Sequence, residues 1–271
     1  MDLSQVKLVI TDMDGTLLDS NHEVSPKFFE LHSALREHDI LFVVASGRPY
    51  YSLIDKLAPI KDDLIFIAEN GGLAIHKDRV LLSTPIEKSN LQNLVTLINT
   101  LEETHPVYCT KEKAYVKSKS AALMGLLSEY YKNYVIIDDE SEITEAVYKI
   151  ALYHEESSER YIYPHVKHLE QHFKVKVSAN HWVDLSENLA NKGHALALIQ
   201  QHYTILPSET MAFGDYNNDI EMLNLSYFSY AMGNAHPFVK ETARFETKTN
   251  NENGVEHILE QLLLAKKTLV T

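Results

Sequence analysis

Two aspartates separated by one residue follow a short apolar run near the start of the chain. The run covers residues 7–10 and leads into Asp12 and Asp14, and Gly15 then permits a tight turn. Such a run is typical of a buried parallel strand, so both acids are expected where the strand ends at the sheet edge. Side chains two positions apart on a strand share a face, which lets both carboxylates face one spot. They would repel each other unless a cation, usually Mg2+, lies between them, and one acid could then attack a substrate while the other moves protons.

The same residues also form ordinary turns, because Asp and Gly are common turn formers and the pattern arises easily by chance. The rest of the chain favours the chemical interpretation. A second apolar run, at residues 211–213, is followed by Gly214 and then by Asp215, Asn218 and Asp219 at the expected start of a helix. The design of the first segment is therefore repeated far downstream.

Two segments between these sites also place polar groups where elements begin or end. A strand expected over residues 40–45 ends in Ser46, Gly47 and Arg48, and Lys192 lies at an expected helix start. Glycines stand beside most of these residues and allow backbone N–H groups to approach an anion closely. The combined pattern predicts a site for phosphate and metal at the ends of the strands.

In this order, the segments resemble the four motifs of the haloacid dehalogenase (HAD) superfamily of phosphohydrolases. The motifs stand at residues 12–16, Ser46, Lys192 and 214–219. Further similarity, to the Cof-type branch of subfamily IIB, lies at residues 69–72, 231–235 and 253–255. The resemblance spans both ends of the chain. It implies a Rossmann-like HAD core, Mg2+ as cofactor, and hydrolysis through an aspartyl-phosphate.

The resemblance also implies a role for each acid. Asp12 is expected to be the nucleophile, and Asp14 the general acid that protonates the leaving group and later the base that activates water. Mg2+ would be bound by the Asp12 carboxylate, the Asp14 backbone carbonyl and Asp215. Asp219 would orient the waters that complete the coordination of the metal.

The phosphoryl group is expected to be held by a second set of residues. Ser46 and Lys192 would bind its oxygens, and the lysine would also reduce the repulsion between an anionic nucleophile and an anionic substrate. Asn218 would position Lys192 or the phosphate. Further candidates for the floor of the cleft are Gly47, Arg48 and Asn70.

Composition agrees with a small-molecule enzyme but does not identify one. The chain has 271 residues and a formal net charge of −13, which disfavours a general nucleic-acid binder because such proteins usually need a basic face. Cys109 is the only cysteine, so no intrachain disulfide can form. No signal peptide or membrane-spanning run is evident. We therefore expect a cytoplasmic monomer or homodimer that binds a small phosphorylated metabolite and neither nucleic acid nor membranes.

The order of apolar and polar segments predicts two domains. Alternating strands and helices predict a doubly wound parallel α/β core, with strands near 6–12, 40–45, 64–68, 210–213 and 227–231 and helices near 25–38, 50–57 and from 254. A change of rhythm after Pro85 predicts an inserted α+β domain, with helices near 87–104, 120–132 and 161–171 and strands near 107–110, 114–117, 146–153, 174–178 and 181–185. The first two of these strands require an antiparallel hairpin. We divide the chain into core residues 1–84, inserted residues 85–186 and core residues 187–271.

In the family such an insert is a cap that closes over the core, which places the expected hinges near residues 83–86 and 186–191. Closure would exclude water from the transferring phosphoryl group. Cap side chains are expected to choose the substrate. Tyr216 stands where the family commonly has a small residue, and it could narrow the cleft.

Three functions are compatible with these residues. The leading prediction is a Mg2+-dependent phosphatase of small phosphorylated metabolites, such as sugar phosphates or a phosphorylated cofactor. A sugar phosphomutase would use the same Asp12 chemistry but needs an intermediate sheltered from water. A non-catalytic metabolite sensor is disfavoured, because a binding module has no need of the full set of Asp12, Asp14, Lys192 and Asp215.

Overall fold

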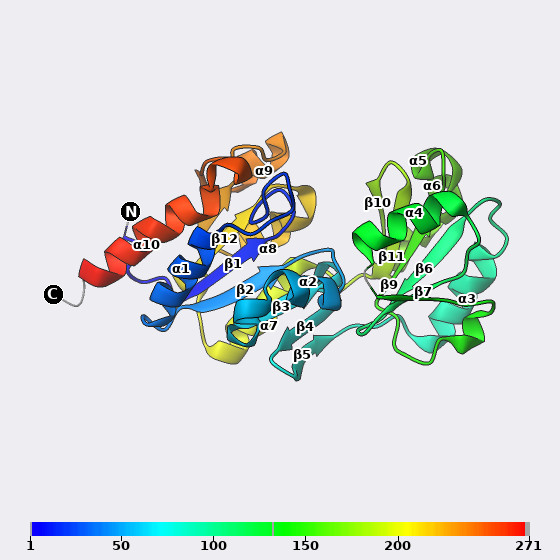
Figure 1. Cartoon of the computed structure of the whole chain (residues 1–271), viewed down its shortest axis with the longest axis horizontal. Coiled ribbons are helices and arrows are strands. Elements are labelled where there is room, and N and C mark those ends of the chain that lie inside the picture. Colours follow the sequence, from blue (N-terminus) through cyan, green and yellow to red (C-terminus); the bar gives the residue numbers. More distant parts are fainter. Residues whose placement is uncertain (1, 132, 269–271) are drawn as a thin grey trace. The chain divides into compact units, whose positions relative to one another are not determined.

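The computed structural model describes residues 2–131 and 133–268 (Figure 1). The chain forms two compact units: Met1–Gly47, Lys56–Leu82 and Asn191–Thr271 make up the first, and Arg48–Asp55 and Ser83–Ala190 make up the second. Apart from the short stretch Arg48–Asp55, the chain passes from the first unit to the second after Leu82 and returns to the first after Ala190. The sequence-based prediction places these two boundaries at 84 and 186. Three stretches of the expected elements and domains lie outside the described residues, namely Met1, Lys132 and 269–271.

The first unit is built on an eight-stranded sheet in the order β14-β13-β12-β1-β2-β3-β4-β5. Its strands are β1 (Leu8–Asp12), β2 (Leu41–Ala45), β3 (Leu64–Ala68), β4 (Leu73–His76), β5 (Arg79–Ser83), β12 (Thr210–Gly214), β13 (Phe228–Ala231) and β14 (Phe245–Glu246). Neighbours from β14 through to β3 are parallel, and β4 is antiparallel to β3. Every residue of β1, β3 and β12 is buried, as expected of parallel strands covered on both faces. The predicted parallel α/β core is confirmed.

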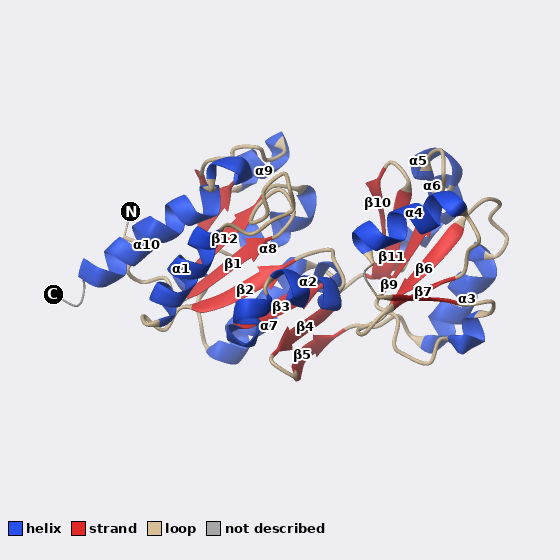
Figure 2. Cartoon of the chain, viewed as in Figure 1, coloured by secondary structure: helices blue, strands red, loops and turns tan. Residues whose placement is uncertain are grey.

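Helices flank this sheet (Figure 2). They are α1 (Pro26–Arg36), α7 (Lys192–Tyr203), α8 (Ile220–Asn224), α9 (Pro237–Thr242) and α10 (Gly254–Thr268), while α2 (Tyr50–Lys56) lies almost entirely in the second unit. Pro26 begins α1, where its missing N–H would have no helical partner in any case. The buried face of α1 carries Phe28, Leu31 and Leu35, and the helix contacts α10, as α7 contacts α8.

The second unit is an α+β fold around a six-stranded sheet in the order β10-β11-β9-β6-β7-β8. Its elements are β6 (His105–Cys109), β7 (Ala114–Val116), β8 (Tyr134–Ile136), β9 (Lys149–Tyr153), β10 (Phe173–Ala179), β11 (Trp182–Glu187), α3 (Lys88–Ile98), α4 (Ala121–Tyr130), α5 (Ser158–Tyr161) and α6 (Tyr163–Val166). The predicted antiparallel hairpin of β6 and β7 is confirmed. Ile150 packs in one core with Ile98 of α3, and Ala151 packs in another with Leu123 of α4, so the sheet buries both faces.

The secondary structure also departs from the sequence-based prediction, and the helix expected near 87–104 ends at Ile98. The structure contains four strands that the apolar pattern does not indicate, β4, β5, β8 and β14, and three of them are edge strands. The helix expected over 161–171 is broken into α5, α6 and the 3-10 segment Lys167–Gln171. Pro164 explains the break, because it lacks an N–H for the preceding turn and instead lies in the first turn of α6.

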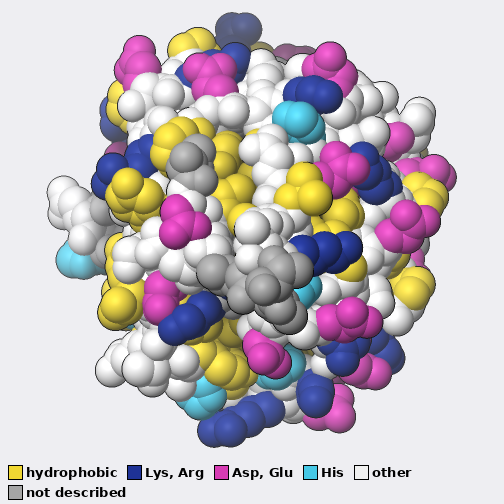
Figure 3. All heavy atoms as spheres, turned by 90° about the vertical axis from the view of Figure 1, so that its left-hand side faces the viewer, with side chains coloured by type: hydrophobic (Ala, Val, Ile, Leu, Met, Phe, Trp, Pro, Cys, Tyr) yellow, Lys and Arg dark blue, Asp and Glu magenta, His cyan; other side chains and the backbone are white. Residues whose placement is uncertain are grey.

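No helix within the described part of the chain combines the length and apolar character needed to cross a bilayer. Figure 3 shows the end of the first unit where α10 terminates, and there Lys and Arg side chains are interspersed with Asp and Glu and with small hydrophobic areas. On this face the acidic excess of the sequence does not form a continuous surface of one sign.

Candidate active site

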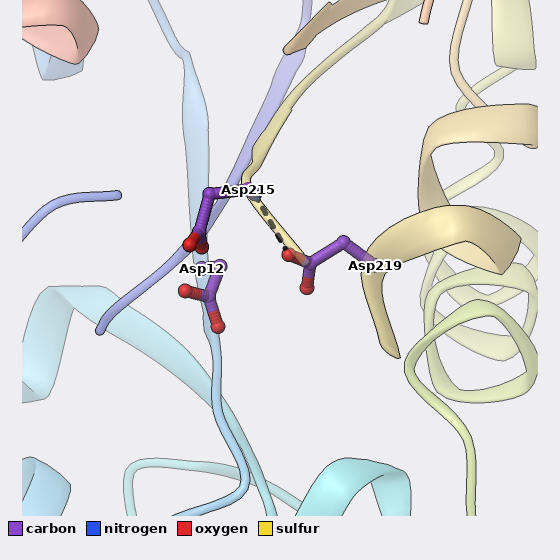
Figure 4. A group of neighbouring side chains, drawn as sticks. All are labelled: Asp12, Asp215 and Asp219. Carbon is purple, nitrogen blue, oxygen red and sulfur yellow. Dashed lines mark hydrogen bonds between the residues drawn. The ribbon is translucent and has the colours of Figure 1, made fainter. Parts of the chain in front are cut away.

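Asp12 and Asp215 leave two neighbouring strands at the same edge of the first unit's sheet. Asp12 is the last residue of β1, and Asp215 follows β12 directly. The two strands are parallel, with Thr11 paired with Phe213. Because the carboxyl ends of parallel strands meet at one sheet edge, the two side chains lie beside each other (Figure 4).

Asp219 completes a group of three carboxylates. One oxygen from each of Asp12, Asp215 and Asp219 lies within 4.8 Å of the others. The turn after β12 brings Asp219 back, so that its Oδ2 accepts the backbone N–H groups of Asp215 (3.0 Å) and Tyr216 (3.1 Å). Gly214 leaves room for this return, because a Cβ at that position would lie 2.6 Å from the Cβ of Asp219.

Lys192 joins this group from the first residue of α7. Its Nζ is buried and lies 2.5 Å from Oδ1 of Asp12 and 2.6 Å from Oδ1 of Asp219. Asn191 caps the helix by accepting the N–H three residues on at 2.7 Å, which fixes where Lys192 leaves the backbone. Gly71, at φ +102°, lies against this cap, and a Cβ there would be 2.2 Å from the Asn191 carbonyl oxygen. The predicted helix start at Lys192 is confirmed.

Three carboxylates and one ammonium give this group an excess of two negative charges when all are ionised. Burial is the main cause that raises the pKa of Asp12 well above its usual value; Lys192 opposes this shift, and the charges of Asp219 and Asp215 add to it. Burial and the charge of Asp219 likewise raise the pKa of Asp215 to about 6. Burial would lower the pKa of Lys192, but the two acids beside it raise it above its usual value, so the lysine stays protonated. Carboxylate oxygens with this charge excess suit a hard divalent cation, which would balance it.

The loop after β1 holds Asp215 in place. Thr16 Oγ1 donates a hydrogen bond to Asp215 Oδ1 at 2.9 Å. Gly15, at φ +79°, comes so close that a Cβ would lie 2.4 Å from Asp215 Oδ2. Asn234 Nδ2 in turn donates to the Gly15 carbonyl oxygen at 2.8 Å. The sequence assigns no role to Thr16 or Asn234, although both stand in segments that carry the family resemblance.

The residues expected to bind phosphate are found in both units. In the first, Asn218 Nδ2 donates to Asn70 Oδ1 at 3.0 Å, so these two amides form a pair. The carbonyl of Ser46 accepts the N–H of Asn70 at 2.9 Å, and a Cβ at Gly47 would lie 3.1 Å from the Asn70 amide. Arg48 begins the short stretch of chain that belongs to the second unit.

Asp14 is not part of the group of Asp12, Asp215 and Asp219. Its side chain is 41% exposed, and Nδ1 of His22 lies 3.6 Å from its Oδ1. Because β1 ends at Asp12, Asp14 lies beyond the strand, and the alternation of side chains along a strand does not determine which way its side chain points. The two acids of the first motif therefore have different surroundings, as two different roles would require.

Residues 9–259 match the family model of the haloacid dehalogenase-like hydrolases. The 5-amino-6-(5-phospho-D-ribitylamino)uracil phosphatase YbjI of Escherichia coli (strain K12) is 30% identical over 264 residues, which cover 95% of this chain and 96% of that protein. The crystal structure of SMU.1108c from Streptococcus mutans UA159 has 30% identity and a TM-score of 0.86, covering 96% of this chain and 99% of its own. The HAD subclass IIB sugar phosphatase BT4131 shares the fold, with a TM-score of 0.81 at 19% identity over 94% of this chain and 98% of its own.

Proposed function

The chain belongs to the haloacid dehalogenase-like hydrolase family and is a phosphatase, and from this premise we propose that it hydrolyses small phosphorylated metabolites with Mg2+ through an aspartyl-phosphate on Asp12. The observation that supports the proposal most directly is the close group of Asp12, Asp215, Asp219 and Lys192, in which all but Asp215 are buried, at the sheet edge where β1 and β12 end. Phosphoryl transfer depends on positioning and charge stabilisation, and this group offers a nucleophile, a fixed ammonium and a place for a cation.

In the first step, a carboxylate oxygen of Asp12 attacks phosphorus while the bond to the leaving oxygen breaks. Asp14 gives its proton to that oxygen, so the alcohol leaves neutral and the phosphoryl group stays on Asp12. In the second step, the ionised Asp14 takes a proton from a water molecule that attacks phosphorus and frees Asp12. Lys192, 2.5 Å from Asp12, reduces the repulsion between the two anionic reactants.

Asp12, Asp215 and the backbone carbonyl of Asp14 would hold the Mg2+. When bound, the cation supplies positive charge that the phosphoryl oxygens need as negative charge builds on them. Thr16 fixes one oxygen of Asp215. Asp219 contacts Lys192 and the turn after β12, so we assign it the task of holding both in place.

The phosphoryl oxygens would be bound by Lys192 and by groups at the end of β2. Ser46 is buried directly after that strand, and the neighbouring amides of Asn70 and Asn218 form a fixed pair beside Gly47. We propose that this edge is the phosphate cradle. The insert at 85–186 is proposed as the cap that selects the rest of the substrate, together with Arg48 and Tyr216.

The substrate class is proposed from the relatives. By its name, YbjI acts on a phosphate ester carried by a ribityl chain on a uracil. Phosphorylated sugars and phosphorylated cofactors or their precursors are therefore the first candidates for this chain.

A phosphate-release screen with Mg2+ tests the proposal. It should cover sugar phosphates, nucleotides, pyridoxal phosphate, flavin mononucleotide and 5-amino-6-(5-phospho-D-ribitylamino)uracil, with Asp12→Asn as the blank. We expect release of free phosphate from at least one class of substrate. A chelator should abolish this activity, and Mg2+ should restore it better than Ca2+, because Ca2+ prefers longer bonds and more ligands. Unimpaired hydrolysis in excess chelator would refute the metal assignment, and transfer to a second sugar without free phosphate would indicate a mutase.

A further inference from the structure

His22 lies in the loop after β1 that also carries Asp14, and the proposed mechanism gives it no role. It lies between β1 and α1, with Nδ1 3.6 Å from Oδ1 of Asp14. Building on the proposed function, we propose that His22 is a positioning residue for Asp14. Its ring holds the Asp14 carboxyl group in the orientation from which the proton reaches the leaving oxygen.

A network of hydrogen bonds fixes the backbone that carries this ring. Oδ1 of Asp19 accepts the N–H groups of Asn21 (2.8 Å) and Glu23 (2.9 Å). The Asp19 carbonyl accepts the N–H of His22 at 3.0 Å, and Lys56 Nζ donates to the His22 carbonyl oxygen at 2.5 Å. The loop therefore presents His22 from a defined turn.

The conformation of His22 is itself a costly one. Its φ is +59°, in the left-handed region, where a residue other than glycine loses about 1 kcal/mol or more. Such conformations persist where the surroundings over-determine them, and they cluster at functional sites. A β-bridge between Asp14 and Leu18 brings the base of the loop back to the acid, and the ring of His22 lies beside Asp14 on this same loop.

The contact matters because burial does not immobilise Asp14. With its side chain 41% exposed, burial alone does not determine the orientation of its carboxyl group. With a proton on Nδ1, attraction between the ring and Oδ1 favours rotamers that keep this oxygen beside His22 and leave Oδ2 for the leaving oxygen. The effect acts on proton transfer, which an alkoxide leaving group needs and an activated phenolate scarcely needs.

The test compares two esters at saturating Mg2+, a sugar phosphate that the screen identifies and 4-nitrophenyl phosphate. The variants are His22→Gly, which removes the ring and relieves the φ, and His22→Asn, which tolerates the φ and keeps an N–H donor. Glu23→Gln, on the same exposed turn, is the control. The readout is kcat/KM, because it reports the steps up to alcohol release.

We expect His22→Gly to lower kcat/KM about tenfold or more for the sugar phosphate and less than about threefold for 4-nitrophenyl phosphate, with partial recovery in His22→Asn and no change in Glu23→Gln. An equal loss on both esters, or no loss on either, would overturn the positioning role while leaving the phosphatase intact. If the wild-type protein hydrolyses neither ester, the proposed function fails and the role of His22 fails with it. Unchanged melting temperatures of the variants exclude a folding effect.

Discussion

Asp12 and Asp14 carry the same side chain in different surroundings, and this difference separates their proposed roles. Asp12 is 5% exposed and ion-paired with Lys192, whereas the side chain of Asp14 is 41% exposed and adjoins His22. A buried carboxylate held by an ammonium suits a nucleophile that must stay in one place. A partly exposed carboxyl group suits a residue that exchanges protons with the leaving group and with water.

Substitution of each acid by asparagine should therefore give two distinct results. We expect Asp12→Asn to lower turnover by roughly 10⁴-fold and to form no phosphoenzyme, because a neutral amide is a poor nucleophile. Asp14→Asn keeps the backbone carbonyl, so with 4-nitrophenyl phosphate it should still form a phosphoenzyme that accumulates for want of a base. Rapid-quench trapping of the acid-labile phosphoenzyme measures both. A phosphoryl group trapped on a residue other than Asp12 would contradict the mechanism.

The sequence indicates the residue types of this site better than their partners. Asp12, Asp215 and Lys192 could be proposed because each stands at an expected strand end or helix start, and such ends meet at one sheet edge. The contacts of Thr16 with Asp215 and of Asn70 with Asn218 join residues 199 and 148 positions apart. No local pattern encodes such pairings, because they depend on how loops from separate strands pack.

At the scale of elements, long buried runs are predictable and short edge strands are not. The strands β1, β3 and β12 read as continuous apolar runs because both faces are covered. By contrast, β14 has only two residues, and all three residues of β8 are exposed. Neither strand therefore shows an alternation of apolar and polar residues that would distinguish it from a loop. These strands form because a neighbouring strand offers unpaired N–H and C=O groups, which is a tertiary effect.

Helix α1 contains a buried base that should make stability depend on pH. His32 is 1% exposed beside the ring of Phe42, and its Nε2 has no hydrogen-bond partner among the described residues. Burial lowers its pKa from 6.5 to about 4. The unfolded chain therefore binds a proton at a pH where the folded chain does not. Stability is complete above pH 6.5 and falls as the pH drops towards about 4.

Replacement of this histidine by leucine should remove that dependence. Between pH 7 and pH 5 we expect protonation of His32 in the unfolded chain to lower the free energy of unfolding of the wild-type protein by up to about 2 kcal/mol. His32→Leu should not show this part of the decrease. Urea titrations at both pH values measure the difference, with the same change at the exposed His202 as the control. Equal pH slopes in His32→Leu and wild type would show that this histidine is protonated without unfolding.

At the scale of the whole molecule, the candidate catalytic residues lie in one of the two units. The three carboxylates and Lys192 come from β1, α7 and the turn after β12, all in the first unit, while the second unit has its own sheet and cores. A ligand that binds only the folded state stabilises that state against unfolding. At a ligand concentration of one hundred times the dissociation constant, the stabilisation is about 2.7 kcal/mol. We therefore expect Mg2+ to stabilise the first unit against unfolding.

Hydrogen exchange followed by mass spectrometry can locate this stabilisation. In saturating Mg2+ without substrate, we expect slower exchange in peptides that contain β1 and β12, because Asp12 and Asp215 leave these strands and the cation offsets their repulsion. Peptides that contain β9 and β11 of the second unit should be unchanged. Asp215→Asn is the matched control, since it removes one carboxylate and should abolish the effect. Equal protection in both units, or protection that persists in Asp215→Asn, would place the metal elsewhere than between Asp12 and Asp215.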